Sequence, residues 1–385
     1  MLNRGVFLMQ ILQHDFTQTI IAILNKYFPG YGDIILNNSQ LLQYINIKTK
    51  AANRGSKSRA SFANHYAIYV LVEDYLNNEF HINSGYEDYQ GSQYMALLMR
   101  QRELPFGSKL QNHALNHRLN EEFKRYFRTS PYLPIIRDSA INRYWINENL
   151  LKIQIDDQLM NIAESIKDII DAYIQARMNS FNEFMVYCQE MIAIQEQSPE
   201  TAIEFIKSLL KPNIDARIFE IVSYAILKQY YAEQVIYWGW SQDELNLEHL
   251  ILYKTGRTNA NDGGIDFVMK PLGRFFQVTE TIDAGKYFLD IDKVQRYPVT
   301  FVIKTEQKPE YLLNKIEEQA KVRYKIKAIV SRYMKCIEEV INIPELMLRF
   351  NQVLEFKRGI QVIEEIVLQN RIEFNMEDEI VNDEE

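Results

Sequence analysis

The chain has 385 residues and a mass of 45.6 kDa, which favours two domains that each bury a sizeable core. With 47% hydrophobic and 24% charged residues, it cannot be a wholly disordered, collagen-like or coiled-coil protein. Because no apolar run has the length of a membrane span, we expect no contact with a membrane. Cys188 and Cys336, the two cysteines, lie far apart and have no ligand-type neighbours, so we expect a reducing, cytoplasmic location without disulfides or a zinc knuckle.

The net charge of −8 conceals an asymmetry along the chain. Residues 1–150 hold 16 Lys and Arg against 12 Asp and Glu, whereas residues 151–385 hold 27 against 39. The basic part is therefore the one that we expect to bind phosphate groups.

Helical periodicity dominates the first half of the chain. Apolar residues at spacings of three and four predict helices over 8–28, 61–78, 92–101, 108–128 and 141–150. Helical spacing continues from about 156 to 210. We therefore expect a mainly helical region at 1–155 and a helical connector at 156–210.

Beyond residue 211 the pattern changes to strands mixed with helices. After a helix over 214–231, we expect strands over 234–237, 249–254, 265–270, 274–280 and 299–304. Helices are expected over 284–296, 309–321, 331–341 and 345–370. This order predicts an α+β protein with an α/β core, in which a mixed sheet flanked by helices occupies 211–345 and is followed by a C-terminal helix and an acidic tail at 346–385.

A β-hairpin carries the most informative residues. The turn signals Asp262-Gly263-Gly264 and Pro271-Leu272-Gly273 bracket one expected strand and precede another. Since side chains alternate between the faces of a strand, the carboxylate of Asp266 and the amide oxygen of Gln277 can converge across the hairpin. Mg²⁺ prefers oxygen ligands and needs only one or two carboxylates beside water and a substrate phosphate.

Glu220, in the preceding helix, is the candidate for a further carboxylate ligand. The apolar stripe of this helix leaves Glu220 on the opposite side, which is typical of a solvated glutamate. Tyr224 and Leu227 share that side, however, so this face could also be covered by other parts of the protein. Both interpretations remain open at this point.

The arrangement of these residues resembles the PD-(D/E)XK nucleases, the fold class of most type II restriction endonucleases and of the Mrr-like nucleases. In that family a helix bears a glutamate, a strand bears an aspartate, and the neighbouring strand carries Glu/Gln-x-Lys. The matching positions here are Glu220, Asp266 and Gln277-Val278-Thr279. The resemblance spans about residues 211–305, and the lead into Asp266 is similar to the Mrr branch.

The block 254–280, together with the helix at 60–75, also resembles HaeII-type restriction enzymes. The resemblance implies magnesium-dependent hydrolysis of double-stranded DNA with 5′-phosphate and 3′-hydroxyl products. Glu220, Asp266 and Gln277 would then hold Mg²⁺. Because a symmetric DNA site usually calls for two active sites, we expect a homodimer.

Thr279 departs from the family pattern, because it stands where the family has its lysine. A neutral threonine cannot supply a positive charge to the attacking water or to the scissile phosphate. We expect Lys286 to replace it, since it follows the second strand at the start of the next helix; Lys254 and Lys304 are weaker candidates. The alternative is a DNA-binding protein that has lost its catalytic lysine.

The helical region at 1–155 is the part that we expect to recognise DNA, and its basic residues are candidates for the contacts. One run has no acidic residue between positions 34 and 72 and comprises Lys48, Lys50, Arg54, Lys57 and Arg59. A second group lies along the helix at 108–128, where Asn116, Arg118 and Arg125 have the side chains that read adenine and guanine or hold phosphates. Arg257, Asn259 and Asn261, which precede the turn at residues 262–264, are further candidates for contacts to DNA. For the basic run and for the helical group, an ordinary solvated surface is about as well supported as DNA binding.

The sequence thus predicts a type II restriction endonuclease. The alternatives are an Mrr-like nuclease that acts on modified DNA and the non-catalytic DNA-binding protein described above.

Overall fold

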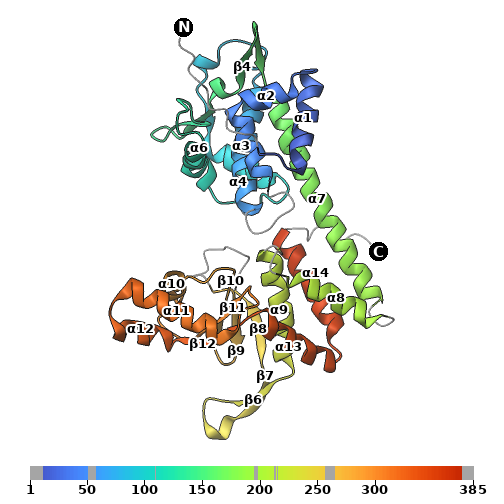
Figure 1. Ribbon diagram of the computed structural model, residues 1–385, viewed down its shortest axis with the longest axis vertical. Helices are drawn as coiled ribbons and strands as arrows, with labels where there is room; N and C mark the ends of the chain where they lie inside the picture. Colours follow the sequence, from blue (N-terminus) through green and yellow to red (C-terminus); the bar gives the residue numbers. More distant parts are fainter. Residues whose placement is uncertain are drawn as a thin grey trace. The chain divides into compact units, whose positions relative to one another are not determined.

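A computed structural model describes residues 12–50, 58–108, 110–194, 198–211, 214, 216–255 and 265–374. The chain forms two compact units, Met1–Asn182 and Glu183–Glu385, which are described separately below (Figure 1). The division falls inside the long helix α7 (Ala163–Ile194), within the stretch that we predicted to be a helical connector. Among the described residues, no helix is both long and apolar enough to span a bilayer.

The first unit is mainly helical, as predicted. Its α-helices before α7 are α1 (Asp15–Tyr27), α2 (Gly32–Asn38), α3 (Gln40–Thr49), α4 (Ser58–Asn77), α5 (Tyr94–Glu103) and α6 (Leu119–Tyr126). A π-helical turn at Ala114–Arg118 precedes α6. The centre of the unit is α4, whose Tyr66 and Tyr75 are fully buried in one apolar core with side chains of the other helices.

The helix predicted over 141–150 is wrong. Residues Arg143–Ile146 form strand β3, which pairs with β2 (Ile135–Asp138) and β1 (Ser92–Gln93). Tyr144 and Ile146 are buried, whereas Arg143 and Trp145 are half-buried, so burial alternates with a period of two. A segment this short contains too few residues to separate the helical period from the strand period.

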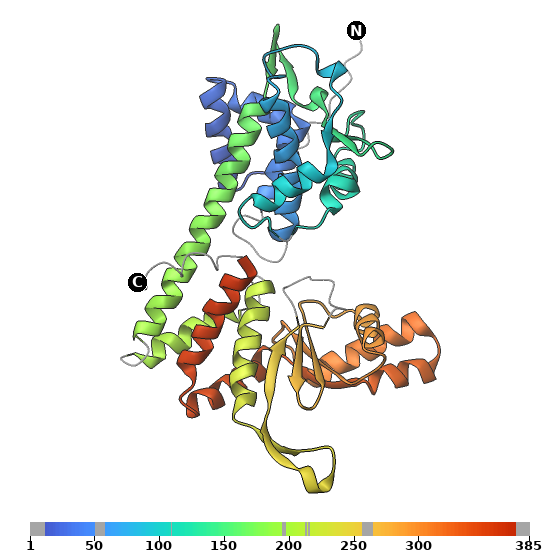
Figure 2. The same ribbon diagram turned by 180° about the vertical axis from the view of Figure 1, so that it is seen from behind.

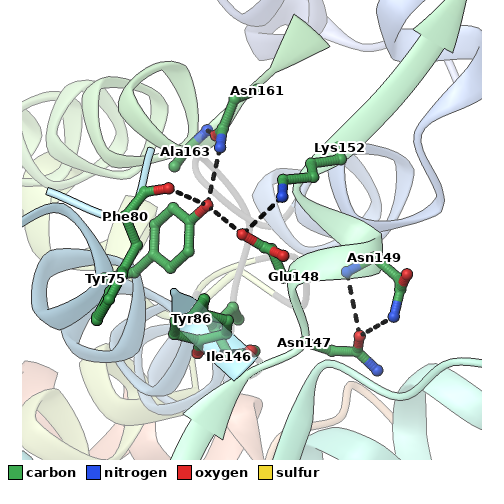
Figure 3. Close-up of polar contacts among 10 residues, drawn as sticks. All are labelled: Tyr75, Phe80, Tyr86, Ile146, Asn147, Glu148, Asn149, Lys152, Asn161 and Ala163. Atoms are coloured by element: carbon green, nitrogen blue, oxygen red, sulfur yellow. Dashed lines mark hydrogen bonds and ion pairs between the residues drawn. The ribbon is translucent and has the colours of Figure 1, made fainter. Parts of the chain in front are cut away.

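A hairpin of β4 (Lys152–Ile155) and β5 (Gln158–Asn161) is joined to α4 through the hydroxyl of Tyr75 (Figure 3). This hydroxyl lies 2.8 Å from Glu148 Oε1 and accepts a hydrogen bond from Asn161 Nδ2 at 3.0 Å. Lys152 in turn forms an ion pair with Glu148 at 2.8 Å. The contacts tie three separate segments of the unit together and satisfy polar groups at the edge of its core.

The second unit contains a mixed five-stranded sheet with the order β12-β11-β10-β9-β8. Its strands are β8 (Ile251–Lys254), β9 (Phe267–Lys270), β10 (Arg274–Thr279), β11 (Val299–Ile303) and β12 (Ile337–Ile341). Neighbours from β8 to β10 are antiparallel, and neighbours from β10 to β12 are parallel. Parallel neighbours need a crossover connection. The crossovers are α10 (Ala284–Lys293) and the pair α11 (Pro309–Tyr324) and α12 (Lys327–Met334).

Helices cover both faces of this sheet, so the predicted α+β class is confirmed (Figures 1 and 2). One face packs through Phe267 and Phe276 against α9 (Ala216–Ala232), α13 (Ile343–Glu355) and α14 (Gly359–Phe374). The other face packs through Phe301 against Tyr287 and its neighbours in α10, and against α11. Helix α8 (Pro199–Leu209) adjoins α9 and α14.

Two predictions for the C-terminal elements need correction. The helix predicted over 331–341 ends at Met334, and β12 follows it. Ile337, Val340 and Ile341 are spaced three and four apart, which misled the helical prediction, but they pack at the edge of the sheet. The single helix predicted over 345–370 is two helices, because Lys357 between α13 and α14 adopts a left-handed conformation with φ of 58°.

A two-stranded ribbon projects from the second unit (Figure 2). It consists of β6 (Val235–Trp238) and β7 (Asn246–His249), and its residues are mostly exposed. The strand predicted over 234–237 is thus confirmed. The one predicted over 249–254 is divided between the end of β7 and β8.

Candidate active site

The predicted hairpin is formed by β9 and β10. In its register Phe276 pairs with Phe267, which brings Asp266, the residue before β9, to the level of Gln277. The backbone N–H of Asp266 donates to the carbonyl of Phe276 at 3.0 Å, and its Oδ2 accepts from the N–H of Val278 at 2.6 Å. The Asp266 carboxylate is thereby held against β10 beside Gln277.

Gln277 has a polar atom that the surrounding protein leaves unsatisfied. The side chain is only 7% exposed, and its Nε2 donates to the carbonyl of Val278 at 3.3 Å. Its Oε1 is buried, and no group in the described parts of the chain donates a hydrogen bond to it. A buried acceptor without a donor costs about 1–3 kcal/mol, so an unoccupied acceptor here calls for an explanation. An amide oxygen with free lone pairs is a suitable ligand for Mg²⁺.

Thr279 lies on the same side of β10 as Gln277. The two residues pair with Ile303 and Phe301 of β11, and both of those side chains belong to the core beneath α10. Lys286, in the first turn of α10, extends its Nζ to within 3.4 Å of Thr279 Oγ1. The Lys286 ammonium therefore lies next to Thr279, the residue that stands where the sequence resemblance would have a lysine.

The start of α10 is held in place by local contacts. The Asp283 carboxylate accepts from the backbone N–H groups of Gly285 and Lys286 at 2.8 and 3.2 Å, which is a standard N-cap. Tyr287 stacks on Phe301 and donates its hydroxyl to the carbonyl of Thr281 at 2.8 Å. Burial raises the pKa of Tyr287, so this hydroxyl remains a neutral donor at physiological pH.

Glu220 is buried and not solvated, which decides between the two interpretations of α9. Its Oε1 lies 3.0 Å from Lys254 Nζ, and the two side chains are 8% and 9% exposed. This ion pair joins α9 to β8 on the α9 side of the sheet, whereas Gln277 and Thr279 face α10. As a metal ligand Glu220 would have to leave its ion pair with Lys254.

The three candidate lysines have different surroundings. Lys254 is paired with Glu220, and Lys304 is paired with Glu280 at 2.6 Å and also contacts the carbonyl of Ile214. Lys286 is exposed, and within the described part of the chain it has no carboxylate partner. Its charge is therefore the one of the three that is not already neutralised.

No group of three or more His, Cys, Asp and Glu side chains suited to a metal ion occurs within the residues that the structure describes. Asp266 and Gln277 would be the protein ligands of a cation at this position, and water and substrate oxygens would complete its coordination. Mg²⁺ accepts this arrangement, because it keeps several waters and commonly binds one or two carboxylates.

The predicted basic arm is only partly described. Lys48 makes contacts within the unit: it lies in α3, forms an ion pair with Glu122 and lies over the ring of Tyr44 at 5.6 Å, with its side chain 15% exposed. Burial alone would raise the pKa of Glu122, but Lys48 and Arg118 hold that pKa below its ordinary value. Lys50 is exposed at the end of α3.

Among the remaining candidates for DNA contacts, some have partners within the unit and others are exposed. Asn116 Oδ1 accepts from the Tyr144 hydroxyl at 3.0 Å, and Arg118 Nε lies 3.4 Å from Glu122, so both serve contacts within the unit. Arg125 is exposed on α6 and has no ion pair to a described residue. Arg59 belongs to α4, but its side chain is not described. The other candidates lie outside the described residues, namely Arg54, Lys57, Arg257, Asn259 and Asn261.

One basic segment is not apparent from the average charge of its half of the chain. Residues 319–337 contain six Lys and Arg and no Asp or Glu, yet they belong to the half of the chain whose overall charge is acidic. A count over short windows would have found this segment, whereas the average over residues 151–385 conceals it.

Comparison with known proteins adds no relative: the chain matches no protein-family model, no curated protein and no solved structure.

Proposed function

We propose that the chain is a magnesium-dependent endonuclease that hydrolyses double-stranded DNA, of the type II restriction kind and with a PD-(D/E)XK-like site. The observation that supports it most is the unsatisfied, buried Oε1 of Gln277 beside the immobilised carboxylate of Asp266. The order of a helix with Glu220, Asp266 before β9, and Gln277 on β10 supports the same proposal. We expect the protein to act in the cytoplasm.

In this proposal Asp266 and Gln277 hold the cation through one carboxylate and one amide oxygen. When bound, Mg²⁺ would lower the pKa of a water molecule and stabilise charge on the phosphate. Lys286 supplies the positive charge that Thr279 lacks, at the position where negative charge develops on the scissile group. Glu220 supports the site indirectly, because its ion pair with Lys254 fixes β8 against α9.

Thr279 also favours a second candidate, a DNA-binding protein without activity. Both candidates would bind DNA, but only the endonuclease would cleave it. A nuclease specific for modified bases would carry the same site and would differ only in its substrate.

The test is incubation of the purified protein with unmodified and with methylated phage DNA in Mg²⁺, followed by sequencing of the ends. We expect Asp266→Ala to abolish cleavage, because it removes a metal ligand, and to leave DNA binding measured in EDTA nearly unchanged. Asp243→Ala, an exposed aspartate in the ribbon loop, is the matched control. Normal cleavage by Asp266→Ala would refute the metal site, and an inactive wild type that still binds DNA would favour the second candidate.

A further inference from the structure

The segment from the end of α11 through α12 presents an exposed basic surface, here called the 321–335 cluster. Its members are Lys321, Arg323, Lys325, Lys327, Arg332 and Lys335, and all six are exposed. Lys325 has a left-handed conformation, with φ of 49°, that reverses the chain between the two helices. This turn joins α11 and α12 (Figure 1), and basic residues of both helices lie close to it in the sequence.

Most of this charge is not neutralised by the protein. Lys321 forms an ion pair with Glu317 at 2.8 Å, whereas the other five members have no ion pair to any residue that the structure describes. The sequence itself contains no acidic residue from 319 to 337. Exposed, unpaired cations at this density attract a polyanion.

The cluster begins beside the candidate active site. Gln319 accepts from the N–H of Ala284 at 3.1 Å and donates to the carbonyl of Ile282 at 3.2 Å, which fixes α11 to the start of α10. One turn later the Arg323 guanidinium lies over Gly285: a Cβ built on that glycine would lie 1.7 Å from Arg323 Nη1. Gly285 immediately precedes Lys286, so Arg323 and Lys286 flank the same turn of α10.

We propose that the 321–335 cluster binds the phosphodiester backbone of the DNA substrate next to the cleavage site, with Arg323 as its innermost contact. This inference rests on the proposed nuclease function and adds a substrate-binding surface in the second unit. Guanidinium and ammonium groups are the usual phosphate contacts, and they fix the position of a duplex without reading its sequence. Val322 and Ile326, which are exposed within the cluster, would also suit an anionic membrane surface. The contact of Arg323 with Gly285, the residue before Lys286, favours DNA.

The experiment measures the affinity of the full-length protein for a 30-base-pair duplex in EDTA at several salt concentrations. The test variant is Lys325→Gln/Lys327→Gln/Arg332→Gln. The control is Lys211→Gln/Lys308→Gln/Lys357→Gln, which removes the same charge from exposed lysines of the same unit, and Lys357 matches Lys325 in its positive φ. Each lost phosphate contact should reduce the salt slope by about 0.9, so we expect a reduction of up to about 2.7 in the test variant and little change in the control.

Gly285→Ala tests the innermost contact without removing any charge. The added methyl would displace only the flexible end of Arg323, so the protein should fold normally while its DNA affinity falls about as far as in Arg323→Gln. Equal slopes in the wild type and both triple variants would refute the inference. Binding to vesicles of anionic lipid without binding to the duplex would also refute it. Because these assays contain no Mg²⁺, they can fail while Asp266→Ala still abolishes cleavage, which separates this inference from the proposed function.

Discussion

At the scale of single residues, Thr279 gives the candidate site no positive charge, and Lys286 is the neighbouring residue that would supply it. Thr279 is nearly buried and neutral, and the Lys286 ammonium stands 3.4 Å from its hydroxyl. If that ammonium stabilises the reacting phosphate, then Lys286→Ala should slow single-turnover cleavage by about 10²-fold or more, as removal of one electrostatic stabiliser does. Lys293→Ala, on the same helix, should cleave at the normal rate.

Thr279→Lys provides the complementary measurement. Introduced into the Lys286→Ala protein, it should restore part of the rate, because it returns a cation to the position that the resemblance assigns to lysine. An unchanged rate in Lys286→Ala would rule out Lys286 as the source of the missing positive charge.

The residues of the site were predictable from the sequence to different degrees. Asp266 and Gln277 belong to one hairpin, so two turn signals and the alternation of side chains were enough to bring them together. The burial of Glu220 depends on Lys254, 34 positions later, and no local periodicity reports it. The ion pair of Lys48 could not be predicted for the same reason, because its partner Glu122 lies in a distant helix.

At the scale of elements, helices with several apolar turns were predicted well, and short segments were not. Residues 143–146 and 337–341 were assigned to helices, yet each is a strand whose neighbours come from elsewhere in the chain. Five residues contain little more than one helical turn, so a spacing of three or four among them fits both structures. Hydrogen bonding to a sheet, which is a tertiary contact, determines that these residues form strands.

The contact between α9 and β8 supports a prediction about stability. Glu220 and Lys254 are both more than nine-tenths buried, so removing one partner leaves an uncompensated charge. Glu220→Ala should reduce the free energy of unfolding of the second unit by about 3–5 kcal/mol, measured in urea by far-ultraviolet circular dichroism. Glu220→Leu/Lys254→Met should lose much less, since neither charge remains.

The matched control is the exposed pair Glu204 and Lys207 on α8. Breaking it with Glu204→Ala should cost at most about 1 kcal/mol. If Glu220→Ala were no more costly than Glu204→Ala, the ion pair would not stabilise the contact between α9 and β8.

At the scale of the whole molecule, net charge is a poor guide to where exposed, unpaired cations lie. The chain carries −8 overall, and its second half is strongly acidic, yet the 321–335 cluster lies in that half. In the first half, by contrast, Lys48 and Arg118 are engaged by Glu122. Exposure and pairing, more than the sum of charges, determine which cations are available to a phosphate.

The last prediction concerns the number of chains that act together. One chain contributes one Asp266–Gln277 site, whereas a duplex has two antiparallel strands that a twofold axis can relate. We therefore expect a homodimer, with twice the mass of 45.6 kDa in sedimentation velocity, that converts a supercoiled plasmid directly into the linear form. When excess Asp266→Ala protein is mixed with the wild type, nicked circles should accumulate instead, because mixed dimers retain a single active site. A wild-type protein that sediments as a monomer and releases nicked circles before linear DNA would contradict this expectation.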